Sequence, residues 1–132
     1  MNILQIPEVY SFIRDPDNRT LKFLQFDSGE GVESRMLIFS TQKLLDILKE
    51  AGTIFADGTF KMAPTPFIQL YILRAEFDGV VVTVCYVMLT SKTQQQYIDM
   101  FRQLQIMCPG LEMSSLMIDF ELAVRYVVCF YV

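Results

Sequence analysis

The stretch FIQLYILRAEFDGVVVTVCYVML, residues 67–89, indicates the fold of this chain more clearly than any other. It holds two long runs of apolar, β-branched and aromatic residues, 67–77 and 80–89, separated by Asp78-Gly79. An Asp-Gly pair between two such runs is a strong signal for a tight β-hairpin turn. Neither run alternates strictly, so we expect both strands to lie in a sheet that is covered on two faces.

The segment before this hairpin is expected to form a strand that ends at an aspartate. The apolar residues 53–56 lead directly into Asp57, and residues 63–66, which include two prolines, connect this segment to the hairpin. Proline cannot donate a hydrogen bond inside a sheet, so residues 63–66 are a connection rather than part of a strand. We therefore expect the Asp57 segment to pair with the first arm of the hairpin.

Further upstream, the pattern predicts a β-hairpin followed by a helix. Residues 20–26 alternate loosely between apolar and polar, residues 36–39 are apolar, and turn-forming residues lie between them, which is typical of two antiparallel strands. Apolar residues recur at helical spacing within residues 42–51. Ser40 or Thr41 can cap the beginning of that helix.

After residue 89 the period of the pattern changes to that of a helix. Ser91-Lys92-Thr93-Gln94 fits a capping box. The residues that recur on one face of the predicted helix are Tyr97, Phe101, Leu104 and Cys108. A short strand is expected around residues 115–118, leading into Asp119, and residues 121–126 resemble the start of a further helix. A crossover through a helix favours parallel pairing, so we expect this strand beside the Asp57 segment.

These elements predict an α/β fold in three parts. Residues 1–19 contain two prolines and a polar cluster, and we expect only a lead-in there. Residues 20–52 form the hairpin and helix, and residues 53–132 form the core sheet. The sequence therefore predicts a mixed sheet in which Asp57 and Asp119 emerge side by side.

Composition excludes several classes of protein. The 132 residues are 52% hydrophobic, which is enough to fill one core. The net charge of −4 does not favour a broad surface that binds a polyanion such as a nucleic acid. The longest apolar stretch, residues 80–89, is about half of the roughly 20 residues needed to cross a bilayer. Residues 1–5 lack the pattern of a secretory signal. We therefore expect an intracellular protein without a membrane span.

The cysteines do not indicate a metal site. Cys85, Cys108 and Cys129 are widely spaced, and the chain contains no histidine. A zinc site of the usual kind needs closely spaced Cys or His ligands. We interpret all three as buried free thiols.

Two carboxylates held close together repel each other unless a cation or a proton lies between them. If the fold brings Asp57 and Asp119 together, Mg²⁺ is the natural occupant, because it takes carboxylate, phosphate and water oxygens. Such ions serve phosphodiester hydrolysis or strand transfer. Arg74, Lys61 and Arg125 are candidates for phosphate contact.

A structural interpretation of the same residues stays open. An aspartate before glycine is often a turn former, and an aspartate after a strand often caps a helix. Glu121 is either a third acidic contributor or a residue of the first helical turn, where negative charge is favourable. Spacing alone does not choose between these interpretations.

Several segments, in the same order, resemble the catalytic region of the Mutator-like element transposases. Residues 55–64, FADGTFKMAP, followed by residues 67–71, FIQLY, resemble the first catalytic block of that family. Residues 89–93, LTSKT, and residues 117–123, MIDFELA, resemble the second. The resemblance extends over about residues 20 to 124.

The resemblance implies a ribonuclease H-like mixed sheet: three antiparallel strands, a crossover helix, and a fourth strand parallel to the first. It implies that two aspartates and a distal glutamate bind Mg²⁺ or Mn²⁺ and cut DNA in the nucleus. Asp57 matches the first aspartate and Asp119 the second. No residue matches the glutamate, so we expect a C-terminally incomplete transposase domain that is inactive alone.

Two alternatives differ in class from a transposase fragment. The first is a non-catalytic interaction module that keeps the same sheet, and the apolar residues 127–132 favour self-association in that case. The second is an unrelated small ligand-binding α/β domain, for which the chain has no glycine-rich phosphate loop.

Overall fold

The computed structural model describes residues 5–29, 34–51, 53–59, 63–111 and 116–118. Their elements in chain order are η1 (Glu8–Ser11), β1 (Phe12–Arg14), β2 (Thr20–Lys22), β3 (Leu24–Asp27), β4 (Met36–Phe39), α1 (Gln42–Glu50), β5 (Ile54–Thr59), β6 (Gln69–Phe77), β7 (Val80–Leu89), α2 (Gln94–Met107) and β8 (Leu116–Ile118). The predicted α/β class is confirmed.

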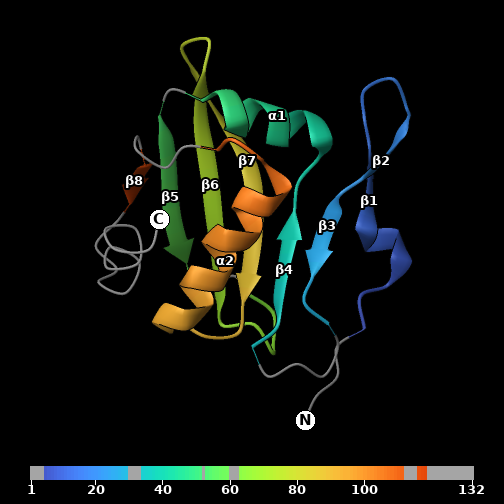
Figure 1. Cartoon of the computed structure of the whole chain (residues 1–132). Coiled ribbons are helices and arrows are strands. Elements are labelled where there is room, and N and C mark those ends of the chain that lie inside the picture. Colours follow the sequence, from blue (N-terminus) through green and yellow to red (C-terminus); the bar gives the residue numbers. More distant parts are fainter. Residues whose placement is uncertain (1–4, 30–33, 52, 60–62, 112–115, 119–132) are drawn as a thin grey trace.

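The larger sheet is mixed, with the order β3-β4-β7-β6-β5-β8 (Figure 1). Four of its five pairings are antiparallel, and β5 and β8 are parallel. The strand predicted over residues 20–26 is divided into β2 and β3, and only β3 pairs with β4. The hairpin of β3 and β4 joins this sheet because β4 pairs with β7. The described sheet thus has β3 at one edge and β8 at the other.

The central hairpin of β6 and β7 forms where the sequence predicted it. The turn residues Asp78 and Gly79 have φ angles of 51° and 74°. Two consecutive positive φ values are what a two-residue hairpin turn of the favoured hand requires, and Asp-Gly tolerates them. The prediction that the Asp57 segment pairs with the first arm is also confirmed, since β5 pairs with β6 from Ile54↔Ala75 to Thr59↔Leu70.

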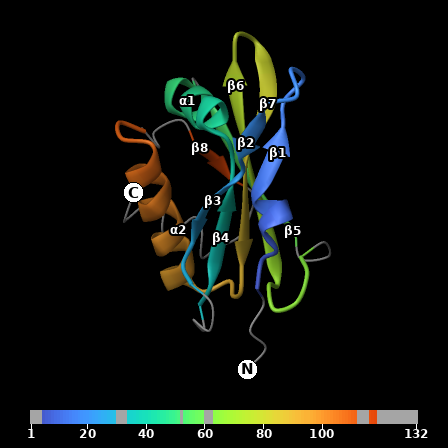
Figure 2. The same cartoon turned by 90° about the vertical axis from the view of Figure 1, so that its right-hand side faces the viewer.

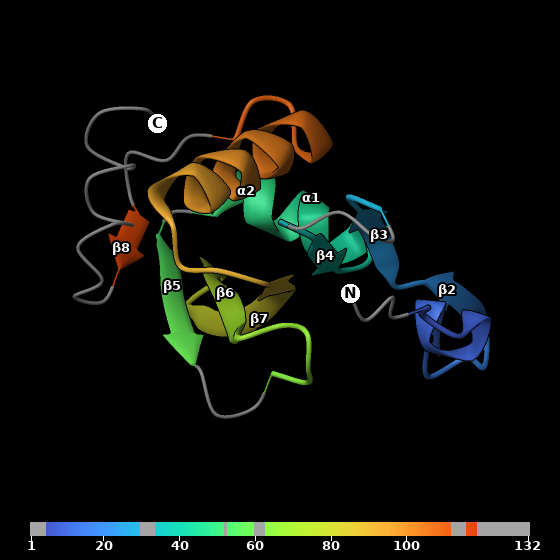
Figure 3. The ribbon, with the colours of Figure 1, turned by 90° about the horizontal axis from the view of Figure 1, so that it is seen from below.

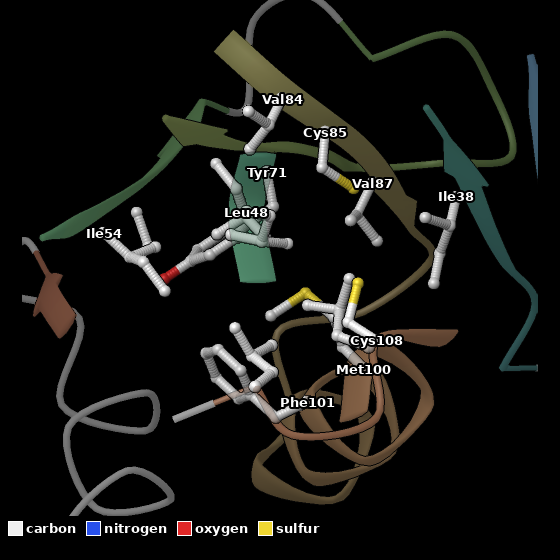
Figure 4. Close-up of a cluster of buried hydrophobic side chains, with 14 of the residues drawn as sticks. Ile38, Leu48, Ile54, Tyr71, Val84, Cys85, Val87, Met100, Phe101 and Cys108 are labelled. Atoms are coloured by element: carbon white, nitrogen blue, oxygen red, sulfur yellow. The ribbon is translucent and has the colours of Figure 1, made fainter. Parts of the chain in front are cut away.

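Both helices pack on the same side of the sheet (Figures 2 and 3). The side chains of Leu48 from α1, and of Met100 and Phe101 from α2, are buried in one core with residues of strands β5, β6 and β7 (Figure 4). Leu45 of α1 belongs to the same core. Cys85 and Cys108 are free thiols inside this core, as predicted, and burial raises the pKa of both. Cys129 lies outside the described residues.

The helices α1 and α2 each begin at a threonine cap. The hydroxyl of Thr41 accepts a hydrogen bond from the Leu44 amide at 3.2 Å, as predicted for α1. The capping box predicted at Ser91 is wrong, because the cap of α2 is Thr93, which accepts from the Gln96 amide at 3.3 Å. The side-chain oxygen of Gln96 instead accepts a hydrogen bond of 2.7 Å from the Ser91 amide, two residues before the cap.

The prediction of a sheet covered on two faces is wrong for the described residues. In β6, Gln69, Tyr71, Leu73 and Ala75 are buried toward the helices, whereas the residues between them are only partly buried. No described helix covers that second side, which we call the open face: Leu70, Ile72 and Arg74 of β6, with Tyr86 and Met88 of β7.

Two features explain why the sequence pattern did not indicate that the two faces differ. The open face carries apolar side chains of its own, so the polarity of successive residues does not alternate. The pairing of β6 and β7 also shifts between Leu73 and Arg74, which leaves Val84 without a partner and makes Val84 and Cys85 both buried. A bulge of this kind breaks the period of two.

The first nineteen residues contain more structure than the predicted lead-in. The strand β1 pairs with β2 to form a separate two-stranded sheet, which stands beyond β3 (Figure 1). The turn between them contains Pro16, with Asn18 at φ 63° and an Arg19–Asp15 ion pair of 2.7 Å. Pro7 and Pro16, on which the prediction of a lead-in was based, lie outside strands β1 and β2.

The C-terminal predictions are tested only in part. The short strand expected around residues 115–118 is present as β8, parallel to β5. The helix expected at residues 121–126 lies outside the described residues. Within the part of the chain that the structure describes, no helix has the length and apolar character needed to span a membrane.

Candidate metal site on strand β5

Asp57 lies within β5 rather than at its end. It is the fourth residue of this six-residue strand, is paired with Ile72 of β6, and is exposed to solvent. The strand continues because Gly58 and Thr59 keep the pairing with Tyr71 and Leu70. The prediction that the strand ends at Asp57 is therefore wrong, and so is the alternative in which Asp57 is a turn former.

The carboxylate of Asp57 belongs to the open face of the sheet. Successive side chains of a strand point to opposite faces, and Ile54 and Ala56 are buried toward the helices. Asp57 thus shares its face with Phe55 and Thr59 of the same strand. An ion or a phosphate could reach it from solvent without entering the core.

Arg74 is a described basic residue that lies on the same face of the sheet as Asp57. It pairs with Phe55, two residues before Asp57, so it is a diagonal cross-strand neighbour on the same face. Long side chains can meet across such a diagonal. Within the described ranges neither residue takes part in an ion pair, so the guanidinium is not committed to the carboxylate.

On the opposite face, Gly58 has no room for a side chain. A Cβ atom there would overlap with Nε2 of Gln69 and would lie 3.1 Å from the ring of Tyr71. The Oε1 atom of Gln69 accepts a hydrogen bond of 2.9 Å from the hydroxyl of Tyr97, and both side chains are buried. The residue after Asp57 is therefore packed tightly against a buried polar pair.

The second predicted ligand, Asp119, lies outside the described residues, as do Glu121, Lys61 and Arg125. The last described parallel pair is Ala56↔Ile118, and Asp57 and Asp119 are the next residues of the two segments in the sequence. Among the described residues there is no group of three or more acidic, Cys or His side chains able to hold a metal. Described residues thus supply one carboxylate, that of Asp57, at this position.

The sequence did not reveal a second set of buried polar groups. Arg35, whose side chain is 4% exposed, forms an ion pair of 2.7 Å with Asp27. The hydrogen bond from Arg35 lowers the pKa of that carboxyl. The side-chain amide of Gln96 donates a hydrogen bond of 3.1 Å to the backbone carbonyl of Arg35. This bond connects the residue before β4 to the start of α2. The local sign of this cluster in the sequence is Gln96, a polar residue at a position of α2 that faces the core.

Two depressions of the surface lie near these elements. One, of about 410 Å³, is lined by three acidic residues, Glu50, Glu76 and Asp78. The other, of about 420 Å³, lies on the open face and is apolar, with Tyr86, Met88 and Leu70 in its wall. Its aromatic rings are close together, since the centroid of Phe23 lies 5.4 Å from that of Phe39.

Comparisons of the chain with protein-family models, with curated proteins and with solved structures found no match. The case for a function is therefore carried by the strand that bears Asp57 and by its neighbours.

Proposed function

We propose that this chain is a partial transposase domain of the Mutator-like type, with a ribonuclease H-like core, whose Asp57 and Asp119 bind Mg²⁺ or Mn²⁺ for chemistry on DNA. The order of elements supports this proposal. Strands β5, β6 and β7 are consecutive and antiparallel, α2 follows, and β8 is parallel to β5. The resemblance implies the same order.

The parallel pairing of β5 with β8 carries the proposal. Continuing it by one residue beyond Ala56↔Ile118 would set Asp57 beside Asp119 on the same face of the sheet. Neighbouring parallel strands lie about 5 Å apart, which is close enough for two carboxylates to share an ion. We propose that this continuation exists.

The exposed carboxylate of Asp57 suits a hard cation, because Mg²⁺ takes oxygen ligands and keeps several waters. When bound, the ion would polarise a phosphodiester and activate a water molecule. Asp57 and Asp119 would hold it, and Arg74 would contact the phosphate from the neighbouring strand. The ion would also offset the repulsion between DNA and a chain of net charge −4.

The family's third carboxylate has no match in this sequence, so we propose that the chain alone binds metal without cutting DNA. Fewer anionic ligands lower both the charge and the geometric definition of a two-metal site. DNA as partner and a nuclear location belong to the same proposal.

Titration calorimetry with Mn²⁺ tests the metal proposal. We expect the unmodified chain to bind, and Asp57→Asn and Asp119→Asn each to weaken binding about tenfold or more, because each removes a charged ligand. Asp99→Asn, on the exposed side of α2, makes the same charge change elsewhere and should leave binding unaltered. Equal heats from the unmodified chain and from the Asp57→Asn, Asp119→Asn double variant would refute the proposal.

The apolar depression on the open face favours a second candidate, a non-catalytic interaction module. Tyr86 is 36% exposed there, beside partly buried Phe23, Phe39 and Met88. Self-association, through this face or through residues 127–132, is part of that candidate. Sedimentation over a wide concentration range tests it, and a monomer at every concentration would count against self-association.

A further inference from the structure

Gly58 of strand β5 lies close against side chains of β6 on the helix side of the sheet. It pairs with Tyr71 of β6, and its Cα faces the side-chain amide of Gln69 across the helix side of the sheet. An added Cβ would overlap with that amide. The amide therefore fills the space in which any other residue would carry a side chain, directly next to Asp57.

The Gln69 amide is itself held in place. The side chain is 1% exposed, and its Oε1 accepts the hydrogen bond of 2.9 Å from the hydroxyl of Tyr97, which is fully buried. Tyr97 belongs to the first part of α2, and its ring centroid lies 6.0 Å from that of Tyr71. A chain of contacts thus runs from α2 through Gln69 to the backbone of β5.

We infer that Gln69 and Tyr97 are positioning residues for Asp57. They fix β5 at Gly58 from the helix side, and they thereby fix the carboxylate one residue earlier on the open face. They cannot be ligands of an ion at Asp57, because they lie on the opposite face of the sheet. This inference rests on the proposed function, and its physical basis is that ligands must be held within a fraction of an ångström for good affinity.

Tyr97→Phe is the most direct variant, since it removes the hydroxyl and keeps the ring. We expect the Kd for Mn²⁺, measured from the electron paramagnetic resonance signal of the free ion, to rise about tenfold, as is common when support of a ligand is lost. Hydrogen exchange of the β5 amides should become faster. Ser40→Ala is the matched control, because it removes a buried hydrogen bond of 2.6 Å to the carbonyl of Val84 in the same sheet. It should alter neither the Kd nor the β5 exchange.

A pair of variants tests the contact without any metal. We expect Gly58→Ala to lower stability in the native background, because the Gln69 amide would have to move away from the added Cβ and would give up its hydrogen bond with Tyr97. In a Gln69→Ala background the same substitution should cost clearly less. Equal costs in the two backgrounds would overturn the inference.

The outcomes separate this inference from the proposed function. If the unmodified chain binds no Mn²⁺, the proposed function fails, and β5 exchange in Tyr97→Phe decides whether Gln69 and Tyr97 fix the strand. If the chain binds Mn²⁺ and Tyr97→Phe changes neither the Kd nor β5 exchange, the proposed function stands and the positioning role is overturned.

Discussion

The ion pair of Asp27 with Arg35 shows how one buried side chain can connect several elements of the fold. Arg35 is 3% exposed, its guanidinium pairs with Asp27 at the end of β3, and its backbone carbonyl accepts a hydrogen bond from the side chain of Gln96 in the first turn of α2. A buried guanidinium is costly unless a negative charge lies close. Asp27 supplies that charge from the neighbouring strand.

We predict that Asp27→Asn destabilises the fold by about 2 kcal/mol near neutral pH, because a partly buried ion pair is lost. The folded protein holds the pKa of Asp27 below its ordinary value of 3.8. The pair therefore stabilises the fold above that value, and its contribution is lost as the pH falls through the lowered pKa. Urea unfolding of both proteins should show a difference that shrinks in acid.

Asp17→Asn serves as the control for that experiment, since Asp17 is exposed and its contact with Arg19 is long, at 3.4 Å. It should change stability little at any pH. An Asp27→Asn difference that stayed constant from neutral pH to strongly acidic pH would show that the charge is not responsible.

Asp57 shows what could be predicted from the sequence at the scale of one residue and what could not. The apolar run and the Asp-Gly pair were visible, but Asp-Gly is also a common turn sequence. Strand β5 continues through Gly58 because Gly58 and Thr59 pair with Tyr71 and Leu70 of β6. A contact between distant residues decides this, and no local pattern contains it.

At the scale of elements, the hairpin of β6 and β7 was predictable because its signals are local. The turn residues supply the two positive φ values, and the apolar runs supply the strands. The crossover rule also predicted the parallel neighbour of β5. The two faces of the sheet were not predictable, because the bulge at Val84 and the apolar open face hide the alternation.

The hairpin turn can be tested at Gly79. A Cβ added there meets nothing within 4 Å, so Gly79→Ala changes only the backbone preference at φ 74°. We predict a loss of about 1 kcal/mol in the free energy of unfolding, measured by urea denaturation. Asp78→Asn should cost less than about 0.5 kcal/mol, since asparagine accepts positive φ. Unchanged stability of Gly79→Ala would contradict this account of the turn.

At the scale of the whole molecule, the two sides of the sheet differ in the side chains that they carry. The helix side forms the core, in which Gln69 and Tyr97 lie, and the open side carries Asp57 and Arg74 beside an apolar depression. The chain is acidic, with a net charge of −4, so a phosphate would approach the open side more readily with a cation in place. A divalent ion at Asp57 would therefore be central to the role with DNA that we propose.

The most direct test of that claim is to titrate the chain with Mn²⁺ and follow the paramagnetic broadening of its backbone amide resonances by NMR. We predict that the signals of Asp57 and of its neighbours Ala56, Gly58 and Ile72 broaden first, and that Asp57→Asn abolishes this selectivity. Selective broadening around the acidic depression at Glu50, Glu76 and Asp78 instead, with the β5 signals unaffected, would contradict the proposal.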